Sequence, residues 1–207
     1  MLGFDIEGKV QLQGKLPQPS RLEVEAKHQA DCGKGKLSPK LKVSAEGGVA
    51  NTVVWIEGVP GGDISSAVEK NYELDQIHCE FNPHIQLIPK GATLSILNSD
   101  GFLHNVRAFD ETALMLFNDA MPKKGQVLRK RFDKPGRILV RCGVHNWMHA
   151  LVVVQDHPYY ALTDEKGAFK IAGIPEGTYT IRAWHESLGE LREEATPQKK
   201  LIVLTYS

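Results

Sequence analysis

The sequence predicts an all-β protein made of packed, mostly antiparallel sheets, and three observations lead to this prediction. Apolar and polar residues alternate with a period of two in most segments, as in strands that bury one face. Gly- and Pro-containing turn signals recur along the whole chain, which is typical of sandwiches and barrels with short connections. Only residues 111–118 have a pattern compatible with a short helix. Helix is therefore expected to be scarce.

The strands are expected where apolar residues alternate with polar ones, or run together, between turns. In chain order the clearest segments are residues 7–17, 22–26, 51–59, 94–96, 136–142 and 151–154, followed by further strands within 159–186. Turns such as Gly47-Gly48, Gly61-Gly62 and Pro175-Glu176-Gly177 separate them.

Size, charge and hydropathy exclude several kinds of protein. The 207 residues are 42% hydrophobic, which is enough for one large domain or two small ones. The 25 Lys and Arg balance 25 Asp and Glu, so no nucleic-acid or anionic-membrane partner is expected. No apolar run approaches the roughly 20 residues of a membrane-spanning helix. A Ser-His-Asp order, a phosphate-binding Gly-rich loop and a paired-carboxylate pattern are also missing, so we do not expect an enzyme of those classes.

The three cysteines help to predict the cellular compartment of the protein. The simplest division pairs Cys32 with Cys79 and leaves Cys142 as a working thiol; the alternative is three unrelated buried thiols. A bridge across that loop would stabilise the fold by about 4 kcal/mol and would persist only in an oxidising compartment. The N-terminus has no signal-peptide pattern, which fits either a cytosolic protein or a mature chain without its leader. Cysteine usage favours the second, a periplasmic or extracellular protein.

Several side chains that can bind a metal ion lie close together in the stretch GRILVRCGVHNWMHALVVV, residues 136–154. Strand alternation puts Cys142 on the inward face of its strand, and the Gly143-Val144 turn then brings His145 and Met148 back over the strand end. Far upstream, His104 begins a strand at the mouth of a loop. A thiolate, two imidazoles and a thioether form a soft ligand set that suits copper in a blue-copper arrangement.

Residues 79–154 resemble the cupredoxin family. The segment CEFNPHIQLIPKGATLSILNSDGFLHNV is similar to the extended strands that lead to a His-Asn pair in that family. The spacing Cys-x2-His-x2-Met matches the shortest ligand loop of the family, found in amicyanin. The resemblance implies that His104, Cys142 and His145 are equatorial ligands of one type 1 copper ion and that Met148 is a weak axial ligand. It also implies that Asn105 ties the two ligand loops together and donates a backbone hydrogen bond to the thiolate.

Residues 159–186 resemble the carboxypeptidase regulatory-like, prealbumin-type β-sandwich. That family usually opens with strands like residues 7–17 and 51–59, which here lie at the other end of the chain. We therefore expect one small sandwich built from residues 1–65 and 156–207, with a Greek-key cupredoxin domain, residues 66–155, inserted between its halves. Two tandem domains remain an alternative.

The other histidines and Trp147 are assigned to the surroundings of this site. His84 and His149 are expected around the copper site, and the alternative is a second copper centre. Trp147 is expected to pack locally, or else to shield the copper or line a docking patch. His28, His78, His157 and His185 are interpreted as ordinary loop or strand-end residues.

A copper ion fully ligated by protein favours electron transfer over catalysis, so the predicted function is a one-electron carrier. Its expected partner is a redox protein such as a c-type cytochrome or a dehydrogenase. Three alternatives stay open. An open copper position would act on nitric oxide, nitrite or oxygen. Copper storage or delivery would need no redox cycling. Structural zinc would use Cys142, His145, His149 and His104, and a structural metal would also suit an adhesion module in which the sandwich binds a polymer.

Overall fold

The computed structural model describes residues 3–198 and 201–207, and over these residues the predicted all-β class is confirmed. Described helix is limited to a 3-10 turn at Ala26–His28, α1 at Gln29–Cys32 and α2 at Ser65–Val68. The chain divides into two compact units. Unit 1 comprises Met1–Ser20, Ser38–Gly62 and His157–Ser207, and unit 2 comprises Arg21–Leu37 and Asp63–Asp156.

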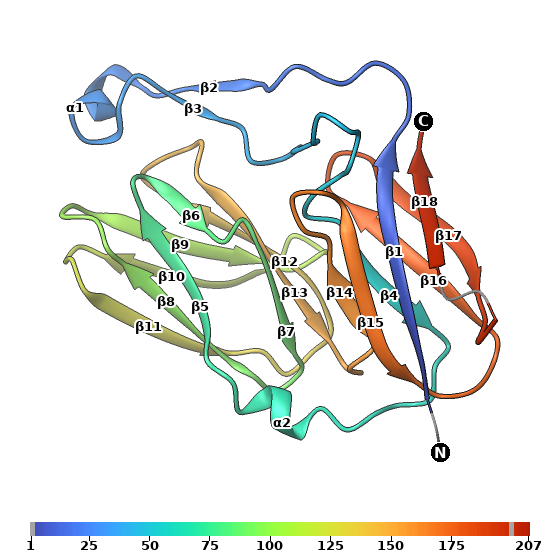
Figure 1. The fold of residues 1–207 in the computed structure, drawn as a ribbon. Helices are drawn as coiled ribbons and strands as arrows, with labels where there is room; N and C mark the ends of the chain where they lie inside the picture. The colour runs from blue at the N-terminus through green and yellow to red at the C-terminus, as the bar shows by residue number, and fades with distance from the viewer. Residues whose placement is uncertain (1–2, 199–200) are drawn as a thin grey trace. The chain divides into compact units, whose positions relative to one another are not determined.

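Unit 1 is built from strands that come from both ends of the chain. Its strands are β1 Phe4–Leu12, β4 Val53–Glu57, β14 Tyr160–Leu162, β15 Ala168–Ile174, β16 Tyr179–His185, β17 Gly189–Ala195 and β18 Leu201–Tyr206. They form two sheets with the strand orders β15-β1-β18 and β14-β4-β16-β17. Blue β1 lies between orange-red β15 and red β18, so the first strand of the chain pairs with the last (Figure 1).

The core of unit 1 joins apolar side chains of both sheets. Ile6 of β1 and Ile171 of β15 belong to the same buried cluster as Ile56 of β4 and Ile181 of β16. At one end, a turn requires Gly167, because its φ of +77° is left-handed and a Cβ there would lie 2.3 Å from the carbonyl oxygen of Val10. The prealbumin-type resemblance of this part of the chain stays a prediction.

Unit 2 is a sandwich of two larger sheets. Its strands are β2 Arg21–Glu23, β3 Gly35–Leu37, β5 Tyr72–Ile77, β6 Glu80–Asn82, β7 Ile85–Pro89, β8 Thr93–Asn98, β9 His104–Phe109, β10 Met115–Met121, β11 Gln126–Arg131, β12 Gly136–Cys142 and β13 His149–Gln155. The sheet orders are β10-β9-β12-β13-β7 and β11-β8-β5-β6, with β2 and β3 paired separately. Leu74 and Ile96 of one sheet share a buried core with Val106, Val140 and Val152 of the other, so the core lies between the sheets.

The predicted helix at residues 111–118 is wrong. These residues form a turn and then enter β10, which pairs antiparallel with β9. The Asp110 side chain accepts hydrogen bonds from the backbone N–H of Thr112 and Leu114, and Ala113 has a φ of 64°. An Asp side chain that bonds its own backbone in this way competes with helix formation and favours a turn.

The segment Arg21–Leu37 lies in unit 2, whereas the sequence placed it with residues 1–65 in the other domain. The strand expected at residues 22–26 is also shorter, since β2 ends at Glu23 and a 3-10 turn follows. A disulfide explains why this segment lies in unit 2. Cys32 is bonded to Cys79, as predicted, with their Cα atoms 5.5 Å apart. The assignment of two domains itself stays a prediction.

None of the helices in the described part of the chain is long and apolar enough to cross a bilayer.

Candidate metal centre

Strand register brings two distant side chains to the same end of the unit 2 sandwich. β9 and β12 pair antiparallel, with Cys142 opposite Val106. His104 and Val106 share one face of β9 because side chains alternate along a strand, and both are fully buried. Cys142 is the last residue of β12 and is 3% exposed. Both side chains therefore point into the sandwich where their strands meet.

A tight loop returns a third side chain to this point. The loop joins the end of β12 to the start of β13 at His149. The Cys142 N–H donates to the Met148 carbonyl oxygen over 3.1 Å, and the Met148 N–H donates to the His145 carbonyl oxygen over 3.0 Å. These two hydrogen bonds fold the loop back on itself and hold the His145 ring against the strand end.

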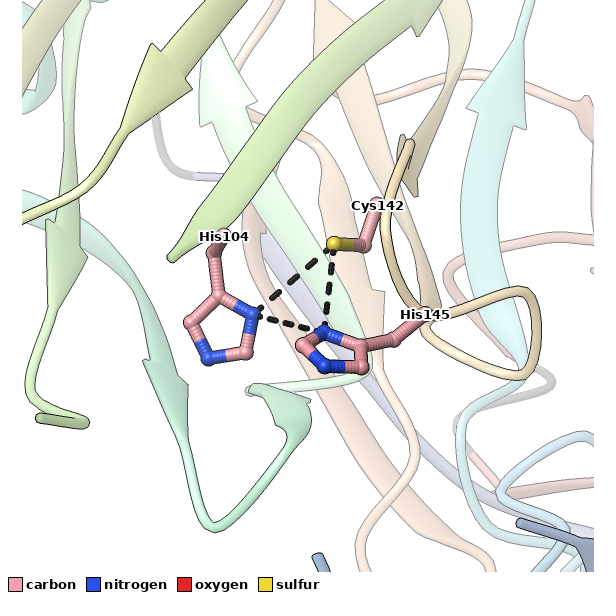
Figure 2. A group of neighbouring side chains, drawn as sticks. All are labelled: His104, Cys142 and His145. Atoms are coloured by element: carbon pink, nitrogen blue, oxygen red, sulfur yellow. Dashed lines mark hydrogen bonds between the residues drawn. The ribbon is translucent and has the colours of Figure 1, made fainter. Parts of the chain in front are cut away.

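The three side chains converge on one point (Figure 2). The Nδ1 atoms of His104 and His145 are 3.0 Å apart. The Cys142 sulfur lies 3.8 Å from Nδ1 of His104 and 3.6 Å from Nδ1 of His145. The exposed fractions of His104, Cys142 and His145 are 0%, 3% and 2%, so the group is shielded from bulk water.

Asp100 decides which nitrogen of His104 faces this point. Its carboxylate oxygen Oδ2 lies 2.9 Å from Nε2 of His104. An acceptor there holds the proton on Nε2 and leaves Nδ1 as the nitrogen available to a metal ion. The sequence did not identify Asp100 as part of the site. The available signal was an acidic residue in the loop immediately before the candidate ligand.

The surroundings of Cys142 favour its thiolate. Burial alone raises the pKa of the thiol, but hydrogen bonds to His104 and His145 and from the backbone N–H groups of Asn105 and Val144 outweigh it and lower the pKa to about 5. The Val144 N–H lies 3.4 Å from the sulfur. Because the thiolate is the form that binds metal ions, a soft metal would meet little competition from a proton on sulfur.

The pKa of the His104 imidazole depends on the same kinds of contact. Burial lowers the pKa of its imidazole, but hydrogen bonds with Cys142 and Asp100 raise it above its usual value. The pKa of the Asp100 carboxyl lies below its usual value, since N–H donors outweigh the effect of burial. A negative charge is thus held beside one candidate ligand and a second develops on the sulfur.

The two nitrogen–sulfur distances fit a bound transition metal. Metal–nitrogen and metal–sulfur bonds of about 2.0 and 2.3 Å with a trigonal angle would separate nitrogen from sulfur by about 3.7 Å. The observed separations are 3.8 and 3.6 Å. Two imidazoles and a thiolate without a carboxylate form a soft donor set, which suits copper or zinc rather than magnesium or calcium.

Two further predicted site residues lie in the segments that carry this group. The Met148 side chain is 2% exposed and belongs to the core of unit 2. The Asn105 N–H is hydrogen-bonded to the Cys142 sulfur, and the Asn105 carbonyl accepts the Gly143 N–H over 3.3 Å. The Asn105 side chain bonds to Asn118. The tie between the two ligand-carrying segments therefore runs through the Asn105 backbone.

The aromatic residues assigned to the surroundings divide into two groups. Trp147 is buried, and its ring centroid lies 5.1 Å from that of His145. His84 and His149 lie together instead, with ring centroids 5.0 Å apart. Among the described residues, neither of these two belongs to the group formed by His104, Cys142 and His145.

His28 is a residue that the sequence reasoning treated as ordinary. Its ring lies edge-on to His145 with a centroid distance of 4.6 Å, and it lies 5.8 Å from the Trp147 ring. His28 ends the 3-10 turn that precedes α1, and α1 ends at the disulfide residue Cys32. No local sequence signal indicates this contact, because it depends on where the disulfide holds residues 21–37.

Comparisons with known proteins give low similarity. No family model matches the chain, and no curated protein matches it. Solved structures with similar parts include a copper-containing nitrite reductase from Thermus scotoductus SA-01, at 22% identity and a TM-score of 0.36, over 42% of this chain and 23% of that one. A purple cupredoxin from Nitrosopumilus maritimus gives 23% identity and a TM-score of 0.37, over 41% of this chain and 100% of that one.

An amicyanin variant in its reduced state gives 20% identity and a TM-score of 0.38, over 49% of this chain and 98% of that one. The matched part spans less than a quarter of the nitrite reductase chain. These TM-scores are all below 0.5, and the candidate metal centre is inferred from the side chains described above.

Proposed function

We propose that unit 2 binds one type 1 copper ion and carries single electrons between proteins. The observation that carries this proposal is the buried group of His104, Cys142 and His145, whose nitrogen and sulfur atoms lie 3.0 to 3.8 Å apart. A copper ion held there would supply one-electron redox chemistry between its Cu(I) and Cu(II) states. Met148 is retained as the weak axial ligand of this proposal.

The chemistry of the ligand group favours copper over zinc. A structural zinc site takes four strong ligands in a tetrahedron. The zinc alternative needs His149 beside Cys142, His145 and His104, but His149 lies with His84 in the described structure rather than with the three candidate ligands. Three strong donors with a thioether nearby are the set that copper takes in electron-transfer sites.

The protein around the site favours electron transfer over catalysis. The ligand side chains are almost fully buried, so a substrate has little access to them. Backbone N–H groups hold the Cys142 sulfur, and Asp100 holds His104. Such bracing keeps the ligands in one arrangement in both oxidation states, which lowers the structural change that each electron transfer requires.

The proposed partner is a soluble redox protein such as a c-type cytochrome or a dehydrogenase. Half-buried Phe102 contacts both imidazoles, with ring centroids 5.2 Å from His104 and 6.0 Å from His145. Its neighbour Leu103 is 44% exposed. A small apolar surface next to a ligand suits a brief, weak encounter. The Cys32–Cys79 disulfide supports a periplasmic or extracellular location.

The test is copper loading of the native chain and of Cys142→Ser, followed by metal analysis, visible absorption and voltammetry. Native protein is expected to bind one copper ion, to show an intense thiolate-to-copper band and to cycle reversibly by one electron. Cys142→Ser is expected to lose both the band and tight copper. A colourless native protein, or unchanged copper binding in the variant, would contradict the proposal. A band that shifts when nitrite is added would indicate an open, catalytic copper site instead.

A further inference from the structure

The carboxylate of Asp100 is a shared acceptor at the edge of the candidate metal centre. Its Oδ1 atom accepts the backbone N–H of His78 over 2.8 Å. Its Oδ2 atom accepts the backbone N–H of Cys79 over 2.9 Å and lies 2.9 Å from Nε2 of His104. Asp100 is 8% exposed, and these three contacts balance the cost of burying its charge.

The loop that carries Asp100 is itself held in place. The Asn98 side chain accepts the Asp100 N–H over 3.0 Å. Its amide group donates to the carbonyl oxygens of Phe102, over 3.0 Å, and Met121, over 2.7 Å. Asn98 is fully buried, so its hydrogen bonds fix the path of the chain from β8 to β9. The carboxylate is therefore aimed at His104 by a structured loop.

Cys79 joins this loop to the second ligand-carrying segment. Its N–H bonds to Asp100, while its carbonyl oxygen accepts the Trp147 indole N–H over 3.1 Å. Trp147 lies in the loop between His145 and Met148. Cys79 has a left-handed φ of 57°, and its sulfur is bonded to Cys32. One disulfide residue thus contacts the supports of both histidines.

We propose that Asp100 is a positioning residue of the metal centre, anchored by Cys79, and that it lowers the reduction potential of the copper held by His104. This inference rests on the proposed copper function. The carboxylate accepts the Nε2–H and makes Nδ1 a stronger donor. Because Cu(II) carries more charge than Cu(I), a stronger donor and a nearby negative charge stabilise the oxidised form more than the reduced form.

The experiment compares copper-loaded native protein with Asp100→Asn. Outer contacts of this kind change metal affinity by about 10- to 100-fold. The amide variant is expected to lose about tenfold more Cu(II) affinity than Cu(I) affinity, which raises the reduction potential by about 59 mV for a one-electron couple. The copper hyperfine pattern in electron paramagnetic resonance is expected to change as well. Asp100→Glu keeps the charge and is expected to return the potential towards the native value.

Asp110→Asn is the matched control. Asp110 follows the opposite end of β9, and it also accepts several local N–H and O–H groups, from Thr112 and Leu114. Its substitution likewise removes the negative charge of a hydrogen-bonded carboxylate, without touching a candidate ligand. Both amide variants are expected to lose stability in urea, but only Asp100→Asn is expected to change the potential and the resonance spectrum.

The Cu(I) form of the native protein provides a measurement that needs no variant. Nuclear magnetic resonance is expected to show a slowly exchanging proton on Nε2 of His104. A native potential and spectrum in Asp100→Asn, or a rapidly exchanging Nε2 proton, would overturn the inference while the copper function stands. Failure of the native protein to form a blue copper site would instead contradict the proposed function.

Discussion

Removal of the disulfide is the change whose magnitude follows most directly from the structure. Cys32 and Cys79 are separated by 47 positions in the sequence. In the chain-entropy model, a cross-link of that length reduces the entropy of the unfolded chain by about 14 cal/mol/K, which is about 4 kcal/mol at room temperature. We expect the variant with both cysteines changed to Ala to lose about this much free energy of unfolding. Alanine avoids a hydroxyl group at Cys79, which is fully buried.

The assay is urea unfolding followed by Trp147 fluorescence. Trp55 and Trp184 belong to unit 1, so replacing both by Phe in parent and variant leaves a reporter in unit 2. With a urea dependence of about 2 kcal/mol/M, the expected loss lowers the unfolding midpoint by about 2 M. The parent chain with its disulfide reduced is the control, and it should unfold close to the Ala variant.

A midpoint within about 0.3 M of the parent, at an unchanged urea dependence, would refute the reasoning. It would mean that the cross-link barely restricts the unfolded chain, or that unit 2 unfolds without separating residues 21–37 from the remainder. A large loss in the Ala variant without a similar loss in the reduced parent would assign the effect to packing at Cys79.

Two further predictions test one support of the site and one turn of unit 1. Trp147→Phe leaves the Cys79 carbonyl oxygen without its indole partner and should lower the free energy of unfolding by about 1–3 kcal/mol. Urea unfolding followed by circular dichroism measures this loss. An unchanged unfolding midpoint would contradict this role of the indole N–H. Gly167→Ala places a Cβ 2.3 Å from the Val10 carbonyl oxygen at a left-handed φ, and should destabilise unit 1 by about 3 kcal/mol. Fluorescence of Trp55 and Trp184 measures this loss, and native-like stability would show that the turn adjusts freely.

The sequence determined those features that depend on neighbouring residues. Alternation of apolar and polar residues predicts strands because successive side chains point to opposite faces of a pleated chain. The short spacing from Cys142 to His145 limits how far apart those side chains can lie. Local patterns failed at residues 111–118, where the side chain of Asp110 bonds the following backbone and a partner strand is available.

Only the tertiary structure decided which distant residues support the candidate site. Register between β9 and β12 brings His104 to Cys142, and the disulfide holds His28 against His145. The hydrogen bonds of Asp100 with Cys79 and His104 also follow from this packing. Such contacts join segments many residues apart, and their geometry depends on the pairing of whole sheets. No spacing within one segment encodes that geometry, which is why the ligand loop could be recognised in the sequence while its supports could not.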